Sequence, residues 1–177
     1  MPMGTLYIVS TPIGNLGDIT LRALETLKSV DLVVCEDTRV SGRLLKHFEI
    51  EKRMLAVNDF NEERQVGKVV SEIQSGTNVA LISDAGTPLV SDPGYKLVRT
   101  AIQMGIKVVA IPGVSAPIAA LTISGLAPDK FMFLGYLPKK DGKKKEILSE
   151  VKQMKDIEKF TAIFFESPYR VIDSLNT

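Results

Sequence analysis

One stretch of this chain combines residue types that could hold a ligand. The segment SDAGTPLVSDPG, Ser83 to Gly94, directly follows the apolar run VALI and contains two Asp, two Gly and two Pro but no basic residue. A simple connection needs far fewer residues, and long structured loops in compact domains are usually functional. Asp84 and Asp92 would repel a phosphate group. The loop therefore favours a ligand that is neutral or cationic at its core.

Three more loops rich in small and polar residues follow predicted strands: TPIGNLGD, EDTR and PGVSA. Turn residues are common in any strand-to-helix loop, but in open parallel sheets ligands bind outside the carboxyl ends of the strands, so loops of this kind together favour a cleft. Gly14 and Gly17 do not complete G-x-G-x-x-G, and no G-x-x-x-x-G-K-[ST] occurs. S-adenosylmethionine, with its sulfonium, ammonium and apolar adenine, fits such a cleft better than a polyphosphate does.

The elements that must position these loops alternate along the chain. Short apolar strands alternate with amphipathic helices, which predicts an α/β fold: a mostly parallel sheet with helices on both faces. The expected strands are 6–10, 31–36, 53–57, 78–82 and 107–111, and the expected helices are 20–30, 39–48, 61–76, 94–105 and 115–125.

The sequence pattern changes after residue 125. A strand over 131–138, the Lys-rich run KKDGKKK, an amphipathic helix, the strand TAIFFES and a last helix from Pro168 predict the start of a second α/β domain. A segment this short cannot bury a good core alone, and the chain stops inside a helix. We therefore expect an N-terminal domain over 1–125 and an incomplete C-terminal domain over 126–177.

Composition is that of an ordinary globular protein, and the net charge limits the kinds of partner that the chain can bind. The 177 residues are 45% hydrophobic with a formal net charge of +1, so a polyanion partner would have to bind local basic patches. The single Cys35 lies in an apolar run and cannot form an intramolecular disulfide, which fits a reducing cytoplasm. No apolar run is long enough for a membrane span, and the N-terminus lacks the pattern of a signal peptide.

Taken in order, the motifs resemble a known family. TPIGNLGDITLRALETL, EDTR, SDAGTPLVSDPGY, PGVSA, SGL, FMFLGYLP and FFESPYR are similar to those of the bacterial ribosomal RNA small subunit methyltransferase I family. That family belongs to the tetrapyrrole-methylase-like superfamily (class III S-adenosylmethionine enzymes), whose tetrapyrrole members carry GDP in place of Gly86-Thr87-Pro88. The resemblance implies a cytoplasmic homodimer that holds S-adenosylmethionine between two α/β domains. It also implies 2′-O-methylation of a cytidine ribose near the decoding centre of 16S rRNA, and a chain that continues beyond Thr177.

The resemblance also implies the residues that contact the cofactor. For several of these residues, elementary physical chemistry supports the implied contact. Gly86 permits close approach of the backbone to a ligand, and Ser115 opens a helix whose free N–H groups can bind heteroatoms of a ligand. A merely structural role for Val90, folded back on the core, stays open. The implied contacts are Ile13, Ala85, Gly86, Thr87, Val90, Ser115, Ala116 and Phe165.

A ribose hydroxyl is a poor nucleophile, so a nearby base would help, although alignment of the reactants could suffice. The only His, His47, lies mid-helix and is better explained by packing or exposure. Carboxylates at predicted strand ends are better candidates, with Asp37 also explicable as a helix N-cap. The candidate bases are Glu36, Asp37, Asp84 and Glu166. No metal site is expected.

The candidate RNA contacts are mostly basic. The Lys run is in itself typical of a solvated loop, but with Arg39 beside Asp37 it could follow phosphates. The candidates are Asn15, Arg39, Arg43, Lys139, Lys140, Lys143 and Lys144, with Lys145 and Lys46 nearby. Three other interpretations stay open: a small-molecule tetrapyrrole methyltransferase, an NAD-binding oxidoreductase and a non-catalytic RNA-binding module.

Overall fold

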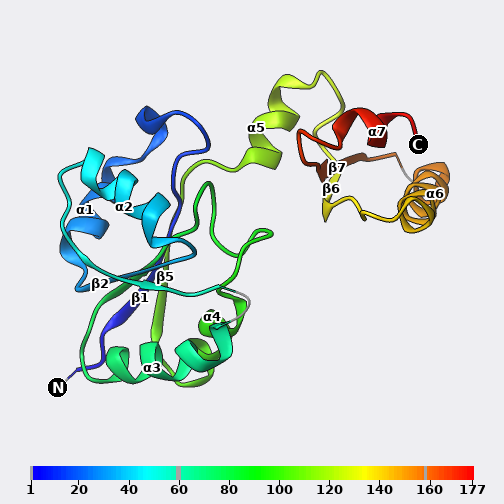
Figure 1. Cartoon of the computed structure of the whole chain (residues 1–177). Coiled ribbons are helices and arrows are strands. Elements are labelled where there is room, and N and C mark those ends of the chain that lie inside the picture. Colours follow the sequence, from blue (N-terminus) through cyan, green and yellow to red (C-terminus); the bar gives the residue numbers. More distant parts are fainter. Residues whose placement is uncertain (1, 59–60, 158) are drawn as a thin grey trace. The chain divides into compact units, whose positions relative to one another are not determined.

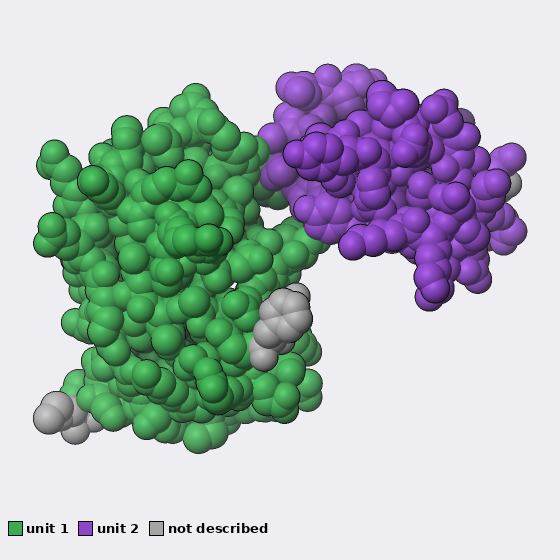
Figure 2. Space-filling model, in the orientation of Figure 1, with its two compact units in different colours: residues 1–115 green, residues 116–177 purple. Residues whose placement is uncertain are grey.

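The computed structural model describes residues 2–58, 61–157 and 159–177, without the side chains of residues 155 and 156. The chain forms two compact units, residues 1–115 and residues 116–177, which Figure 2 colours separately. Each unit is described here by itself. The helix over 116–123 belongs to the second unit, whereas the sequence analysis assigned it to the first.

The first unit is a five-stranded parallel sheet whose strands alternate along the chain with helices that cover the sheet (Figure 1). The strand order is β3-β2-β4-β1-β5. Strands β1 and β4 are therefore neighbours, and the loops that follow them leave the sheet side by side. The elements in chain order are β1 (Thr5–Val9), η1 (Leu16–Asp18), α1 (Leu21–Ser29), β2 (Leu32–Cys35), α2 (Thr38–His47), β3 (Arg53–Ala56), α3 (Glu62–Gln74), β4 (Val79–Leu81), α4 (Tyr95–Gln103) and β5 (Lys107–Ile111).

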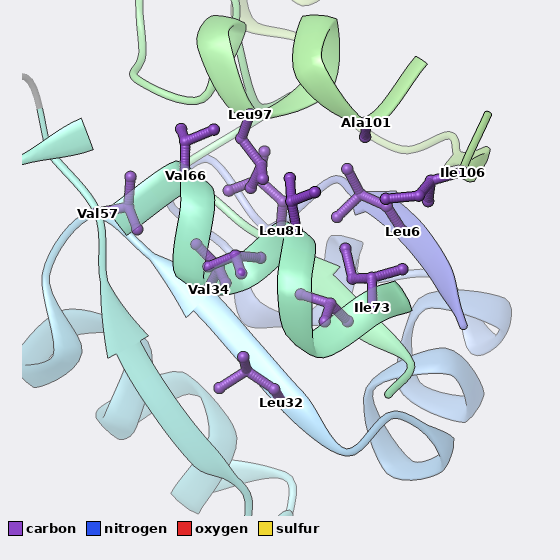
Figure 3. Close-up of a cluster of buried hydrophobic side chains, with 13 residues drawn as sticks. Leu6, Leu32, Val34, Val57, Val66, Ile73, Leu81, Leu97, Ala101 and Ile106 are labelled. Atoms are coloured by element: carbon purple, nitrogen blue, oxygen red, sulfur yellow. The ribbon is translucent and has the colours of Figure 1, made fainter. Parts of the chain in front are cut away.

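Side chains from both faces of the sheet are buried. Because successive residues of a strand point to opposite faces, Leu32 and Val34 join the cluster under α3 and α4, while Val33 and Cys35 join the cluster under α1 and α2. Figure 3 shows the first cluster, with Val66 of α3 among the side chains of the strands. The predicted α/β fold with helices on both faces is confirmed.

Helix boundaries follow from identifiable local signals. The Thr20 side chain accepts a hydrogen bond from the backbone N–H of Ala23 at 3.1 Å and begins α1. Helix α3 buries Val66, Val69 and its neighbours at helical spacing, as the periodicity predicted. Gly76, just past α3, adopts a φ of +103°, which a side chain would strain.

The second unit pairs two parallel strands, β6 (Phe131–Tyr136) and β7 (Thr161–Phe165). Its helices are α5 (Ala116–Ile123), α6 (Asp141–Ile157) and α7 (Val171–Leu175). Helix α6 begins at Asp141, inside the Lys-rich run that the sequence analysis placed before the helix. An acidic residue in a first turn is stabilised by the helix dipole, which explains the earlier start. Within the described residues, no helix combines the length and apolar character needed to cross a membrane.

Candidate ligand site at the carboxyl edge of the sheet

Two of the predicted loops are joined by backbone hydrogen bonds. The N–H of Thr11, after β1, donates to the carbonyl of Gly86 at 2.9 Å, and the N–H of Gly86 donates back to Thr11 at 3.0 Å. The Thr11 hydroxyl also donates to the carbonyl of Ser83 at 3.1 Å. Gly86 has a φ of +85°, and a Cβ there would lie 3.3 Å from the Ile13 side chain. The structure thus brings together the predicted cofactor contacts Ile13 and Gly86.

Thr87 joins a third loop to these two. Its hydroxyl donates to the carbonyl of Val114, after β5, at 3.0 Å. The same oxygen lies 3.2 Å from the hydroxyl of Ser10, which therefore acts as the donor to Thr87. The side chain predicted to contact a cofactor is engaged in holding three loops together, and its contact with a ligand stays a prediction.

The second half of the Ser83–Gly94 loop has a costly backbone conformation. Leu89 and Ser91 have φ angles of +75° and +67°, in the left-handed region that favours glycine. Such residues cost on the order of 1–3 kcal/mol each and persist only where surrounding contacts determine them. Val90, between them, keeps 37% of its surface exposed. Its side chain is therefore available for contact, and it is not buried in the core.

The far end of this loop is held by Glu62, a residue that the sequence analysis did not single out. The Glu62 carboxylate oxygen Oε1 accepts hydrogen bonds from the backbone N–H groups of Gly94 at 3.1 Å and Lys96 at 3.0 Å. Glu62 is buried, with 7% of its surface exposed. A sequence signal did exist, since Glu62 lies four residues before Val66 on the buried face of α3. A carboxylate on that face needs a partner inside the fold.

A hollow of about 250 Å³ lies beside these loops in the first unit. It brings together Asp84, a candidate base, and Arg43, a candidate RNA contact, which are far apart in the sequence. Its other lining residues come from the loop after β1 and from α2. The lining residues are Thr11, Pro12, Gly14, Leu16, Val40, Arg43, Leu44 and Asp84.

The carboxylates of the long loop have perturbed proton affinities. Partial removal from water raises the pKa of Asp84. A hydrogen bond from the backbone of Asp37 lowers this pKa by more than the charge of the Asp37 carboxylate raises it. The guanidinium groups of Arg39 and Arg43 also lower it. Burial likewise raises the pKa of Asp92. A raised pKa makes a carboxylate a stronger base, which favours Asp84 among the candidates.

Asp37 has a different environment, because Arg39 occupies both of its oxygens. The Arg39 Nη2 lies 2.6 Å from Oδ2, its Nε lies 3.1 Å from each oxygen, and its backbone N–H donates to Oδ1 at 2.8 Å. These hydrogen bonds lower the pKa of Asp37 to about 2. Asp37 therefore caps α2 and orients Arg39, whose side chain is 88% exposed. The geometry disfavours Asp37 as a base.

Glu36 is half-buried at the end of β2, next to Cys35. Burial raises the pKa of the Cys35 thiol, so Cys35 has no thiolate character. Among the described residues, no group of three or more His, Cys, Asp or Glu is arranged to hold a metal ion.

Glu166 is engaged inside the second unit. Its carboxylate accepts hydrogen bonds from the Ser174 hydroxyl at 2.6 Å and the Ser167 N–H at 2.7 Å, and it pairs with Arg170 at 2.5 Å. The Ser174 hydrogen bond is the main reason that the pKa of Glu166 is lowered. A carboxylate with this many partners is a weaker candidate base than Asp84.

The remaining predicted contacts lie on both units. Ser115 directly precedes α5, which begins at Ala116, so the expected helix start is present. Phe165 ends β7 and packs edge to face against Phe133, with ring centroids 4.7 Å apart. Asn15 is exposed and accepts the N–H of Gly17 at 3.0 Å.

The predicted cluster of Lys side chains is only partly exposed. Lys139, Lys140 and Lys143 are exposed, but the Lys144 side chain is 5% exposed and its Nζ lies 3.4 Å from Asp141. Lys144 therefore belongs to the packing of α6 in this structure. The exposed members are the ones available to follow a phosphate backbone.

A parallel sheet whose carboxyl-edge loops are tied together beside a hollow defines an α/β protein of the kind that holds ligands at strand ends. The chain belongs to the family Tetrapyrrole (Corrin/Porphyrin) Methylases, whose sequence profile matches residues 5–176. This match confirms the superfamily predicted from the motifs.

Curated relatives carry a more specific name. The chain is 56% identical over 170 residues to Ribosomal RNA small subunit methyltransferase I of Mesorhizobium japonicum, covering 96% of this chain and 56% of the relative. It is 50% identical over 172 residues to the protein of that name from Escherichia coli O157:H7, covering 97% and 59%. The chain thus spans less than two thirds of the length of these relatives. The predicted resemblance to this family is confirmed.

A solved structure agrees at the level of the fold. Uroporphyrin-III-C-methyltransferase from Thermus thermophilus superposes with a TM-score of 0.62 at 22% identity, covering 82% of this chain and 72% of that one. At this identity the likeness supports the fold alone.

Proposed function

We propose that the protein to which this chain belongs transfers a methyl group from S-adenosylmethionine to the ribose 2′-oxygen of a cytidine in 16S rRNA, near the decoding centre. The observation that carries the proposal is the 50–56% identity, over nearly the whole chain, to relatives named for methylation of small-subunit ribosomal RNA. The match to a methylase family favours methyl transfer over the NAD-dependent alternative. We further propose that the protein acts as a homodimer in the cytoplasm.

The residues of the first unit fit the methyl donor chemically. S-adenosylmethionine supplies an activated methyl group when bound. The Ser83–Gly94 loop offers carboxylates and no basic side chain, which suits a cation. Close approach of backbone at Gly86, next to Ile13, and the exposed face of Val90 suit an apolar ring. On this proposal the donor contacts of the first unit are Ile13, Ala85, Gly86, Thr87, Val90 and Ser115. The sequence-based proposal also includes Ala116 and Phe165 of the second unit.

The hollow beside the loop suits the acceptor. Bound S-adenosylmethionine would supply the methyl group that the ribose 2′-oxygen takes up, and the carboxylate of Asp84 would receive the proton released from that hydroxyl. The apolar side chains of Val40 and Leu44 would exclude water from the acceptor. Arg39 and Arg43 would hold phosphates next to the acceptor, and the exposed side chains Lys139, Lys140 and Lys143 of the second unit would bind phosphates of the same RNA. Alignment of the two reactants accounts for much of the acceleration.

Two measurements test the proposal. Calorimetric titration of the full-length protein with S-adenosylhomocysteine and with NAD is expected to show binding of the first only. Incubation with isolated 30S subunits and labelled methyl donor, followed by mass mapping of the RNA, is expected to add one methyl group to a cytidine ribose of 16S rRNA. Binding of NAD alone, or methylation of a small tetrapyrrole and not of the subunit, would overturn the proposal.

A further inference from the structure

We infer that Glu62 is a positioning residue for the donor loop: its carboxylate fixes the end of Ser83–Gly94 and thereby sets the presentation of Val90. The inference rests on the proposed function, because it assigns Val90 and its neighbours to the methyl donor. Glu62 lies on α3, outside all the loops that the motifs identify.

The first observation is that Glu62 caps a helix to which it does not belong. Helix α4 begins at Tyr95 after Gly94, which has no side chain to accept a hydrogen bond from the free N–H groups. Glu62 supplies the acceptor from α3, bonding the N–H groups of Gly94 and Lys96 with one oxygen. A charged acceptor at a helix N-terminus makes a strong hydrogen bond, and burial strengthens it further.

The second observation explains why the cap comes from another element. Gly94 has a φ of +118°, and a Cβ added there would lie 2.7 Å from Leu81 and 3.2 Å from Leu89. The usual capping residues Ser, Thr, Asp and Asn therefore do not fit at this position. A capping side chain at position 94 would clash with Leu81 and Leu89. The hydrogen-bond acceptor for this helix end therefore comes from Glu62 on α3.

The third observation is that the strained part of the loop lies between two anchors. On one side, Thr87 is bonded to Val114. On the other side, Glu62 holds Gly94. Leu89 and Ser91, both with left-handed backbone, lie between these anchors and enclose Val90. Because strained conformations persist only where neighbouring contacts determine them, loss of the Glu62 anchor is expected to let this stretch relax and Val90 move.

Glu62 is itself held in place at the carboxyl end of β3. Its backbone N–H donates to the carbonyl of Asn58 at 2.8 Å, and the Asn61 side chain donates to the carbonyl of Ala56 at 3.2 Å. The anchor therefore starts from a strand of the same sheet that carries the loop. Hydrogen bonds to Asn58 and Ala56 thus connect the neighbourhood of Glu62 to the carboxyl end of β3.

The test compares Glu62→Ala and Glu62→Gln with Glu63→Gln in the full-length protein. The amide oxygen of Gln can still accept both N–H groups, whereas Ala cannot. Glu63 is the matched control, because its side chain is 91% exposed and its carboxylate makes only a long ion pair, 3.7 Å, with the Lys96 Nζ. The readouts are the Kd of S-adenosylhomocysteine by calorimetry, and the KM for the donor and kcat with 30S subunits.

We expect Glu62→Ala to raise the Kd and the donor KM about tenfold, because loss of both hydrogen bonds to Glu62 lets the donor loop leave its binding conformation. We expect kcat to stay within about twofold, because the acceptor residues are untouched. Glu62→Gln should restore most of the affinity, and Glu63→Gln should match the wild type. A purely structural role would lower the unfolding temperature without this split between KM and kcat.

Glu62→Ala that folds and binds S-adenosylhomocysteine as the wild type does would overturn the inference. If Glu62→Ala does not fold, Glu62→Asp takes its place: it keeps the charge but shortens the reach, and a wild-type Kd would again overturn the inference. Failure of the wild type to bind S-adenosylhomocysteine at all is a different outcome, which rejects the proposed function instead.

Discussion

The guanidinium of Arg39 lies with its Nη2 2.6 Å from Oδ2 of Asp37, and the same carboxylate caps α2 through the N–H of Arg39. The two acidic residues Asp37 and Asp84 at this edge of the sheet have pKa values shifted in opposite directions. Hydrogen bonds from Arg39 lower the pKa of Asp37, whereas partial burial raises the pKa of Asp84. The carboxylate that orients an arginine and the carboxylate suited to accept a proton are therefore different residues.

The pH dependence of stability should reflect the Asp37–Arg39 pair. The folded-state pKa of Asp37, about 2, lies below its ordinary value of 3.8. The stabilising contribution is therefore fully present above the ordinary value and lost as the pH falls through the folded-state pKa. In thermal unfolding between pH 5 and about pH 2, Asp37→Asn should show a smaller loss of Tm on acidification than the wild type. Because the pair is exposed, we expect the difference to be small; a difference of opposite sign would contradict the assignment.

Asp84 should determine the acidic limb of the pH–rate profile. As a base it must be deprotonated, so kcat/KM should fall as the pH drops through its pKa, which is raised from 3.8. Asp84→Asn should remove that limb and lower kcat by about 10²–10⁴-fold. The same substitution should raise the urea midpoint at neutral pH, because a carboxylate with a raised pKa destabilises the fold when ionised.

Asp92→Asn is the control for Asp84. Its pKa is also raised by burial, but it does not line the hollow. The variant should keep both the acidic limb and kcat. An Asp84→Asn enzyme with full kcat would show that alignment alone drives the transfer.

Two glycine substitutions should have opposite effects on stability. Gly94→Ala places a Cβ 2.7 Å from Leu81 at a φ of +118°, so we expect a loss of at least about 1–3 kcal/mol in the free energy of unfolding. Gly67→Ala, within α3 and with no atom within 4 Å of the added Cβ, should gain about 0.5–1 kcal/mol. Urea unfolding monitored by circular dichroism measures both. Equal effects would contradict the packing of the loop end against β4.

The lysines of α6 should separate RNA binding from folding. Lys143 is exposed, and Lys143→Ala should weaken binding to 30S subunits and reduce the slope of log Kd against log salt by about 1. Lys144 is buried beside Asp141, so Lys144→Ala should mainly lower Tm and leave the salt slope unchanged. A salt slope that changes with Lys144 and not with Lys143 would reverse these assignments.

Much of the fold could be predicted because its signals are local. The periodicity of Val66, Val69 and Ile73 identified α3, and the apolar runs identified the buried strands of the parallel sheet. The loops at the carboxyl edge could also be grouped, because parallel strands carry their ends to one side. That grouping put the loops of Ile13 and Gly86 at one edge of the sheet, but the contact between the two residues is seen only in the structure.

Features that depend on contacts between distant segments could not be predicted in this way. The role of Glu62 requires the place of Gly94 against Leu81, which no local pattern contains. The left-handed backbone at Leu89 and Ser91 occurs at residue types that seldom adopt it. Lys144 resembled its exposed neighbours in sequence, but its side chain is buried and its Nζ lies 3.4 Å from Asp141 and 3.5 Å from the Thr177 hydroxyl.

The two left-handed residues on either side of Val90 have a consequence for engineering. The backbone at position 90 is set by its neighbours and by the anchors beyond them, so the side chain there can change with little effect on the path of the loop. Under the proposed function, a smaller residue at this position would leave more room beside the methyl donor without changing the hydrogen bonds that hold the loop. Position 90 is thus a place to adapt the enzyme to synthetic sulfonium donors that carry groups bulkier than methyl.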